Sequence, residues 1–217
     1  MLTSIRYTVN RDREAALNLL HQLQLKTDHK LRVLDVGGWH NQWAPQFVTD
    51  VIDIFDVPRV NTFRGNINMP YVWQEIVENV QEHGMFDFCI CTHTLEDIAN
   101  PRLALEVMPS IAKQGFIAIP SKFAEFKMNH FGFRGSIHHR WIFNKEGSRV
   151  VAYPKINYLE NTPKFNRLAE DFSNSNEELQ FFWEDSLKDV LFVNDDYLGP
   201  SDYAVMEYYN NLLNGYG

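Results

Sequence analysis

Short apolar runs alternate with amphipathic stretches along the first 120 residues. The apolar runs predict largely buried strands at residues 31–36, 48–54, 60–63, 86–91 and 116–119. Leucine and alanine at helical spacing predict a helix over residues 12–25, and further helices are expected over 71–82 and from Asn100 towards Lys113, where Pro109 is expected to kink or split the helix. Strands that alternate with helices are typical of a doubly wound sheet. The predicted fold class is therefore α/β, Rossmann-like, with a mainly parallel sheet.

The character of the chain changes after Pro120. Residues 141–143 and 150–153 flank a Lys-Glu-Gly turn and predict a β-hairpin. Residues 180–183 and 190–193 predict two more strands, interpreted as an antiparallel edge, and 203–213 predicts a final helix. The simplest organisation is one domain over residues 1–217, with an insertion at about 122–160 after the fifth strand.

Composition and charge narrow the classes of partner. The 217 residues carry a formal net charge of −8 and no dense cluster of Lys and Arg, which disfavours nucleic acid as a partner. No apolar stretch approaches the ~20 residues of a membrane span, and the first 13 residues lack the apolar segment of a signal peptide. Cys89 and Cys91 are interpreted as reduced core thiols. A cytoplasmic location is the corresponding expectation.

The predicted strands end in residues suited to a ligand. Asp35 and two glycines, Gly37 and Gly38, close the first strand, and Asp53 closes the second. Glycine lets the backbone approach a ligand closely, and an acid on the adjacent strand can accept hydrogen bonds from ribose hydroxyls. Because ligands of such sheets bind outside the carboxyl ends of the strands, these residues predict a nucleotide-like cofactor. The alternative is a tight turn with no ligand.

The order of the motifs resembles that of class I S-adenosylmethionine (SAM)-dependent methyltransferases. The matching segments are 33–38, Asp53, 65–68, 86–97, Asn100-Pro101 and 112–121. The resemblance implies SAM as cofactor and S-adenosylhomocysteine (SAH) as product. The positions expected to bind the cofactor are Asp35, Gly37, Gly38, Trp39, Asp53, Asn66, Ile67, His93 and Thr94.

The chain departs from that pattern after the first strand. Trp39 stands near the usual third glycine, and residues 39–47 are short for a crossover helix, so a turn is expected there. Trp39 either closes over the cofactor or packs beside it. A complete Gly-x-Gly-x-x-Gly is absent, which argues against a nicotinamide cofactor.

Histidines in the insertion are the candidates for acid–base chemistry. A histidine can accept a proton near neutral pH. His138 and His139 point to opposite sides if the segment is extended, so one of them is expected to face the cofactor. His139 is favoured, with His138 and His93 as rivals, and structural hydrogen bonding is the alternative. No metal site is expected, because adjacent histidines chelate poorly and no acidic pair has suitable spacing.

Aromatic and basic residues surround these histidines. The candidates for acceptor binding are His130, Arg134, Arg140 and Trp141, which would suit the apolar face and hydroxyl rim of a sugar. The string 137–143 also resembles methyltransferase-like proteins of glycan and polysaccharide synthesis. The alternative is packing of the aromatic residues onto the sheet.

The resulting hypothesis is a SAM-dependent O-methyltransferase that acts on a hydroxyl of a sugar or glycan. Two alternatives stay open: an O- or N-methyltransferase for another small molecule, and a methyltransferase-like binding or scaffold protein without turnover.

Overall fold

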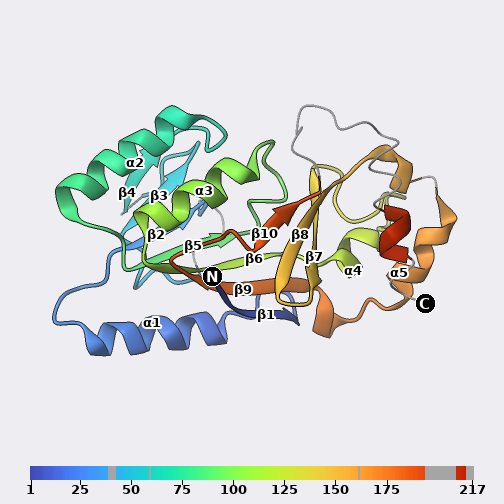
Figure 1. The fold of residues 1–217 in the computed structure, drawn as a ribbon, viewed down its shortest axis with the longest axis horizontal. Helices are drawn as coiled ribbons and strands as arrows, with labels where there is room; N and C mark the ends of the chain where they lie inside the picture. The colour runs from blue at the N-terminus through green and yellow to red at the C-terminus, as the bar shows by residue number, and fades with distance from the viewer. Residues whose placement is uncertain (39–42, 59, 161, 194–208, 214–217) are drawn as a thin grey trace.

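The computed structural model, which describes residues 1–38, 43–58, 60–160, 162–193 and 209–213, is built on a seven-stranded sheet (Figure 1). The strand order is β1-β9-β6-β5-β2-β3-β4. Its strands are β1 (Leu2–Thr8), β2 (Val33–Val36), β3 (Asp50–Asp53), β4 (Asn61–Arg64), β5 (Phe88–Thr92), β6 (Gln114–Pro120) and β9 (Glu178–Glu184). Strands β2 to β6 are parallel, whereas β9 runs antiparallel to both β6 and β1. The predicted α/β class with a mainly parallel sheet and an antiparallel edge is confirmed.

Both faces of the sheet are covered. Helix α1 (Glu14–Lys26) lies on one face, and α2 (Pro70–His83) and α3 (Pro101–Ile111) lie on the other (Figure 1). Alternate side chains of β2 enter the two cores, with Val33 towards α1 and Leu34 on the opposite face. This two-sided burial explains why the parallel strands are continuous apolar runs in the sequence.

Helix α3 follows the start signal read from the sequence. Asn100 caps it by accepting a hydrogen bond from the Leu103 amide at 3.3 Å, and Pro101 occupies the first turn. The helix continues as a single element past Pro109 to Ile111 instead of splitting. Pro109 stands two residues before the end of the helix.

A second, three-stranded sheet packs against the first. It consists of β7 (Trp141–Glu146), β8 (Arg149–Pro154) and β10 (Val190–Phe192). The predicted hairpin is confirmed as β7 and β8. The expectation that residues 190–193 belong to the antiparallel edge is wrong, because β10 pairs in parallel with β8. At the antiparallel edge of the seven-stranded sheet, the outermost strand is β1, which the sequence patterns do not predict.

The chain between β6 and β9 has a small core of its own. Besides β7 and β8, its elements are α4 (Lys122–Phe126), η1 (Asn157–Leu159), η2 (Pro163–Phe165), α5 (Asn166–Glu170) and η3 (Asn174–Asn176). Phe126, Leu159 and Phe165 pack there with Tyr209. Of the predicted last helix, residues 209–213 are helical, and 203–208 lie outside the described residues.

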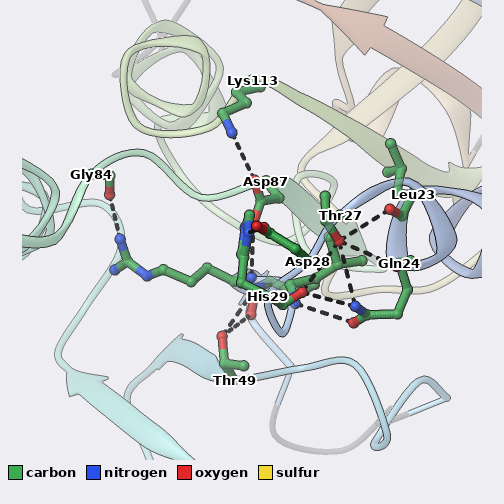
Figure 2. A network of polar contacts seen from close by, with 12 residues as sticks. Leu23, Gln24, Thr27, Asp28, His29, Thr49, Gly84, Asp87 and Lys113 are labelled. Carbon is green, nitrogen blue, oxygen red and sulfur yellow. Dashed lines mark hydrogen bonds and ion pairs between the residues drawn. The ribbon is translucent and has the colours of Figure 1, made fainter.

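Polar contacts join the segments at the amino ends of the parallel strands (Figure 2). Lys113 donates to one oxygen of Asp87 at 2.7 Å, and the Arg32 amide donates to the other at 3.0 Å. Burial raises the pKa of Asp87, but these two donors outweigh it and hold the pKa below its usual value. The described part of the chain contains no helix that is long and apolar enough to cross a membrane.

Candidate active site

A cavity of about 1060 Å³ opens at the carboxyl ends of the parallel strands. Residues that end or follow β2, β3, β4 and β5 line it, among them Gly37, Asp53, Asn66 and Thr94. Strand β2 lies between β3 and β5, so the chain order reverses at β2. Such a reversal is where open α/β sheets bind ligands.

The ends of β2 and β5 approach too closely for any residue but glycine at position 37. Gly37 has φ +77°, and a Cβ there would lie 2.3 Å from Oγ1 of Thr94. Thr94 in turn donates to the Val36 carbonyl at 3.2 Å. A Cβ on Gly38 would lie 2.4 Å from Oδ2 of Asp35. The two glycines therefore permit close packing, and Gly37 also lines the cavity.

Six of the nine predicted cofactor residues line this cavity together. They are Gly37, Asp53, Asn66, Ile67, His93 and Thr94. Asp53 accepts from the Phe55 amide at 3.0 Å, which fixes its carboxylate at the end of β3. Ile67 presents a buried apolar side chain, and its carbonyl accepts from the Trp73 indole at 2.8 Å.

The three other predicted cofactor positions have different outcomes. Asp35 and Gly38 are not among the cavity-lining residues, and Trp39 lies outside the described residues. The segment 43–47 contains turns and no helix, which agrees with the expected loss of the first crossover helix over the part that is described.

Asp35 lies within β2, and its side chain is buried. Its Oδ1 accepts no hydrogen bond from the described residues. Burial raises the pKa of Asp35 to about 7, with a further rise from the charge of Asp53 and an opposing effect from Arg13. Asp35 therefore takes up a proton near neutral pH.

His93 is held between two buried carboxylates. Its Nε2 lies 2.7 Å from Oε1 of Glu178, and its Nδ1 lies 3.4 Å from Oε1 of Glu96. Burial lowers the pKa of His93, but the bonds to the two carboxylates outweigh it and raise the pKa to about 9. His93 is an imidazolium at neutral pH. Its φ of +50° is uncommon outside glycine and is typical of a constrained functional position.

Glu178 joins three segments at this edge of the sheet. Arg13 donates to both of its oxygens, at 2.6 and 2.9 Å, and Gln180 donates at 2.9 Å. Burial raises the pKa of Glu178, but its bonds to His93, Arg13 and Gln180 bring the pKa down to about 2. Glu178 starts β9 and is paired with Pro120, so the antiparallel strand delivers it to the cavity.

His139 and its neighbours form the other side of the cavity. His139 Nδ1 lies 2.5 Å from Oε1 of Glu125, and its Nε2 lies 3.6 Å from Oδ1 of Asp97. His138 Nε2 lies 3.7 Å from the same Asp97 oxygen. The expectation that the two histidines point to opposite sides is wrong. The backbone turns here, with the His139 amide donating to the Ser136 carbonyl at 3.2 Å, and both rings face Asp97.

Lys155 fixes Glu125 behind His139. Its ammonium group donates to Oε2 of Glu125 at 2.8 Å and to the Ser136 carbonyl at 2.9 Å. Burial lowers the pKa of His139, but the hydrogen bond and charge of Glu125, aided by Glu96 and Asp97, raise it above its usual value.

Three predicted acceptor residues lie away from the cavity. The Arg134 side chain is buried and donates to the carbonyls of Phe126 and Leu159, so it supports the insertion. Trp141 is a core residue whose indole donates to the Ile98 carbonyl at 3.0 Å. Arg140 is exposed and is not among the lining residues. These placements correct the predictions for Arg134, Trp141 and Arg140, while His130 does line the cavity.

The sequence analysis missed Arg13, Glu125 and Glu178. Glu178 precedes a predicted strand, but only the pairing of that strand beside β6 brings it to the site. Arg13 stands at the start of a predicted helix, and a charged residue at that position does not by itself indicate a site. Glu125 lies in a short helix capped by Ser121, which accepts from the Ala124 amide at 3.2 Å. A Ser-x-x-x-Glu pattern after Pro120 was the signal available for that helix.

No family model and no curated protein matches the chain. Among solved structures, the SAM-dependent methyltransferase from Agrobacterium tumefaciens is 13% identical, with TM-score 0.41 over 82% of this chain and 64% of that chain. The cyclopropane-fatty-acyl-phospholipid synthase-like protein from Lactobacillus casei is 10% identical, with TM-score 0.37 over 82% of this chain and 95% of that one.

The MycE methyltransferase of the mycinamycin pathway, solved with Mg, SAH and mycinamycin VI, is also similar. It is 18% identical, with TM-score 0.35 over 55% of this chain and 36% of that chain. At these values we draw nothing about activity from the three structures. The strand order of this chain by itself establishes the doubly wound fold.

Proposed function

We propose that the protein is a SAM-dependent O-methyltransferase that acts on a hydroxyl of a sugar or glycan. The observation that carries the proposal is a single cavity at the chain reversal in the sheet. It is lined by six residues that the methyltransferase resemblance assigns to the cofactor, and by His138 and His139. The cofactor and the proton-accepting group would thus share one space.

The residues of the cavity fit the parts of the cofactor in turn. Asp53 offers carboxylate oxygens to ribose hydroxyls at the end of β3. Asn66 and the apolar Ile67 follow β4 and would suit the adenine. His93 and Thr94, which follow β5, would border the methyl end of the cofactor. When bound, SAM supplies a methyl group that is already activated by its sulfonium.

The histidines differ in their suitability as proton acceptors. Both ring nitrogens of His93 face carboxylates, and its pKa of about 9 keeps it protonated at neutral pH. His139 binds Glu125 through Nδ1, which leaves Nε2 directed towards Asp97 at 3.6 Å, beyond hydrogen-bond distance. In neutral His139 this places the lone pair on Nε2, where an acceptor hydroxyl would lose its proton. We assign the proton-accepting role to His139, with His138 beside it.

The outer part of the cavity suits a ring with one apolar face. His130 lines it, and its ring centroid lies 3.8 Å from that of Phe131, with the two rings tilted by 42°. Phe131 is 73% exposed. Asn129 and Lys127 also line it and add polar groups. An apolar ring face and a hydroxyl rim could both be satisfied there, which is compatible with a sugar acceptor.

Removal of both histidines tests the proton-accepting role. The double variant His138→Ala/His139→Ala is expected to lower methyl transfer to a hydroxyl acceptor about 10²-fold, because the acceptor then keeps its proton. Transfer of labelled methyl to a panel of sugars measures turnover, and SAH affinity measured in parallel shows that the cofactor site survives. His83→Ala, an exposed histidine remote from the cavity, is the matched control. Unchanged turnover in the double variant refutes the assignment of the proton-accepting role to these histidines.

A further inference from the structure

Asp97, His138 and His139 converge on one point in the wall of the cavity. Each offers one ligand atom, and these atoms lie within 4.8 Å of one another. We infer that these three side chains bind a divalent first-row transition-metal ion. The sequence alone predicts no metal site, because adjacent histidines chelate poorly and no acidic pair has suitable spacing.

The two separations from Asp97 suit a shared ion. Oδ1 of Asp97 lies 3.6 Å from Nε2 of His139 and 3.7 Å from Nε2 of His138. Ligand atoms that are each about 2.1 Å from one ion lie roughly 3–4 Å apart. Among the described residues, Asp97 Oδ1 has no hydrogen-bond partner although that atom is buried. A buried oxygen that has no hydrogen bond and lies between two imidazole nitrogens is an arrangement that a shared metal ion would satisfy.

Backbone hydrogen bonds fix the segment that carries His138 and His139 against the segment that carries Asp97. The amides of Arg140 and Trp141 both donate to the Glu96 carbonyl, at 2.6 and 3.2 Å. These bonds fasten the residue after His139 to the residue before Asp97. The turn that ends at His139 then brings His138 to the same side.

Glu125 and Lys155 orient His139 as a metal ligand would require. Its Nδ1 is bonded to Glu125, which directs Nε2 away from Glu125 and towards the proposed ion. Metal-binding histidines almost always donate their second nitrogen to a carboxylate or carbonyl in this way. Lys155 holds the other oxygen of Glu125 at 2.8 Å.

The ligand set indicates the class of ion. Two imidazole nitrogens and one carboxylate oxygen suit Zn²⁺, Fe²⁺, Co²⁺ or Mn²⁺ better than Mg²⁺ or Ca²⁺, which prefer oxygen ligands alone. Three protein ligands also leave coordination positions open towards the cavity.

The inference rests on the proposed function and refines it, because an ion here would bind the acceptor oxygen directly. Coordination lowers the pKa of a hydroxyl, so its O–H bond breaks and the proton passes to solvent water. The bound oxygen then forms a bond to the methyl carbon. The bond from carbon to the sulfonium breaks, and its electron pair stays on sulfur. With the ion bound, His139 would hold the ion, and this role would replace the proton-accepting role assigned to it above. The loss of turnover expected for His138→Ala/His139→Ala would then come from loss of the ion.

Calorimetric titration of the metal-free, 217-residue protein with Zn²⁺, in the absence of SAM, tests the site. We expect one tight site that is lost in Asp97→Asn and in His139→Ala, and weakened about 10–100-fold in Glu125→Gln, which removes only the supporting carboxylate. His130→Ala, which changes another cavity-lining histidine, is expected to retain the Zn²⁺ affinity. Co²⁺ should give a visible absorption band that disappears in the same variants, and Mg²⁺ should bind at least 100-fold more weakly than Zn²⁺.

Zn²⁺ binding that survives in Asp97→Asn and His139→Ala, or no binding by the wild type, would overturn the inference. The cluster would then be a set of polar contacts of His138 and His139 with Asp97. SAH affinity is measured separately for each variant. Loss of the metal site with SAH binding retained refutes this inference alone, whereas failure of the wild type to bind SAH refutes the proposed function.

Discussion

Replacement of Glu178 by alanine is expected to lower the free energy of unfolding by about 3–5 kcal/mol. Glu178 accepts two hydrogen bonds from the buried guanidinium of Arg13 and one from His93. Removing one partner of a buried ion pair leaves the other charge without compensation, and that cost exceeds the loss of an exposed pair. Urea denaturation of the variant and the wild type at pH 7 measures the difference.

The same variant has a second readout that a general loss of packing would not produce. The pKa of His93, about 9 in the wild type, is expected to fall in Glu178→Ala because one of its two carboxylate partners is gone. NMR titration of the imidazole measures it. Glu177→Ala is the matched control, because it alters the preceding side chain and keeps the backbone carbonyl that binds Ser121. Equal losses of stability in both variants, with an unchanged pKa of His93, would contradict the account.

Asp35→Asn is expected to stabilise the protein in a pH-dependent manner. The folded-state pKa of Asp35 is raised from 3.8 to about 7, so the folded protein binds a proton that the unfolded chain has released. The wild type therefore loses stability as the pH rises from about 4 to 7, and above about 7 this loss is complete. Asparagine has nearly the same shape and no such penalty.

Relative to the wild type, Asp35→Asn should gain about 3 kcal/mol between pH 5 and pH 8. Urea denaturation at the two pH values gives this difference directly. Asp56→Asn changes an exposed aspartate, and its free energy of unfolding should change between pH 5 and pH 8 as that of the wild type does. A constant difference between Asp35→Asn and the wild type across this range would show that Asp35 stays ionised in the folded protein.

The parallel half of the fold follows from local patterns. Residues 33–36 and 88–92 are buried on both faces of the sheet, so apolar runs and their alternation with helices suffice to predict them. Strand β1 escaped prediction because its burial is irregular and half exposed. Strand β10 was misplaced because pairing with β8 depends on long-range packing, which no local pattern encodes.

The residues of the candidate site likewise fall into those that local sequence patterns predict and those that they do not. Gly37, Asp53 and Thr94 each follow a predictable strand, and the fold rule alone brings them to one edge. Arg134 and Trp141 misled the sequence analysis, since charge and aromatic character do not reveal whether a side chain faces a cavity or supports a loop. Glu178 and Glu125 reach the site only through β-strand pairing and the turn of a short helix.

The measurement that tests the central claim most directly is calorimetric titration of the purified protein with SAM and SAH. Micromolar binding of both is expected, at least tenfold weaker in Asp53→Ala, which removes the proposed ribose acceptor, and unchanged in the exposed control Asp56→Ala. Absence of binding to the wild type, or equal affinity in Asp53→Ala and the wild type, would contradict the assignment of this cavity to the cofactor.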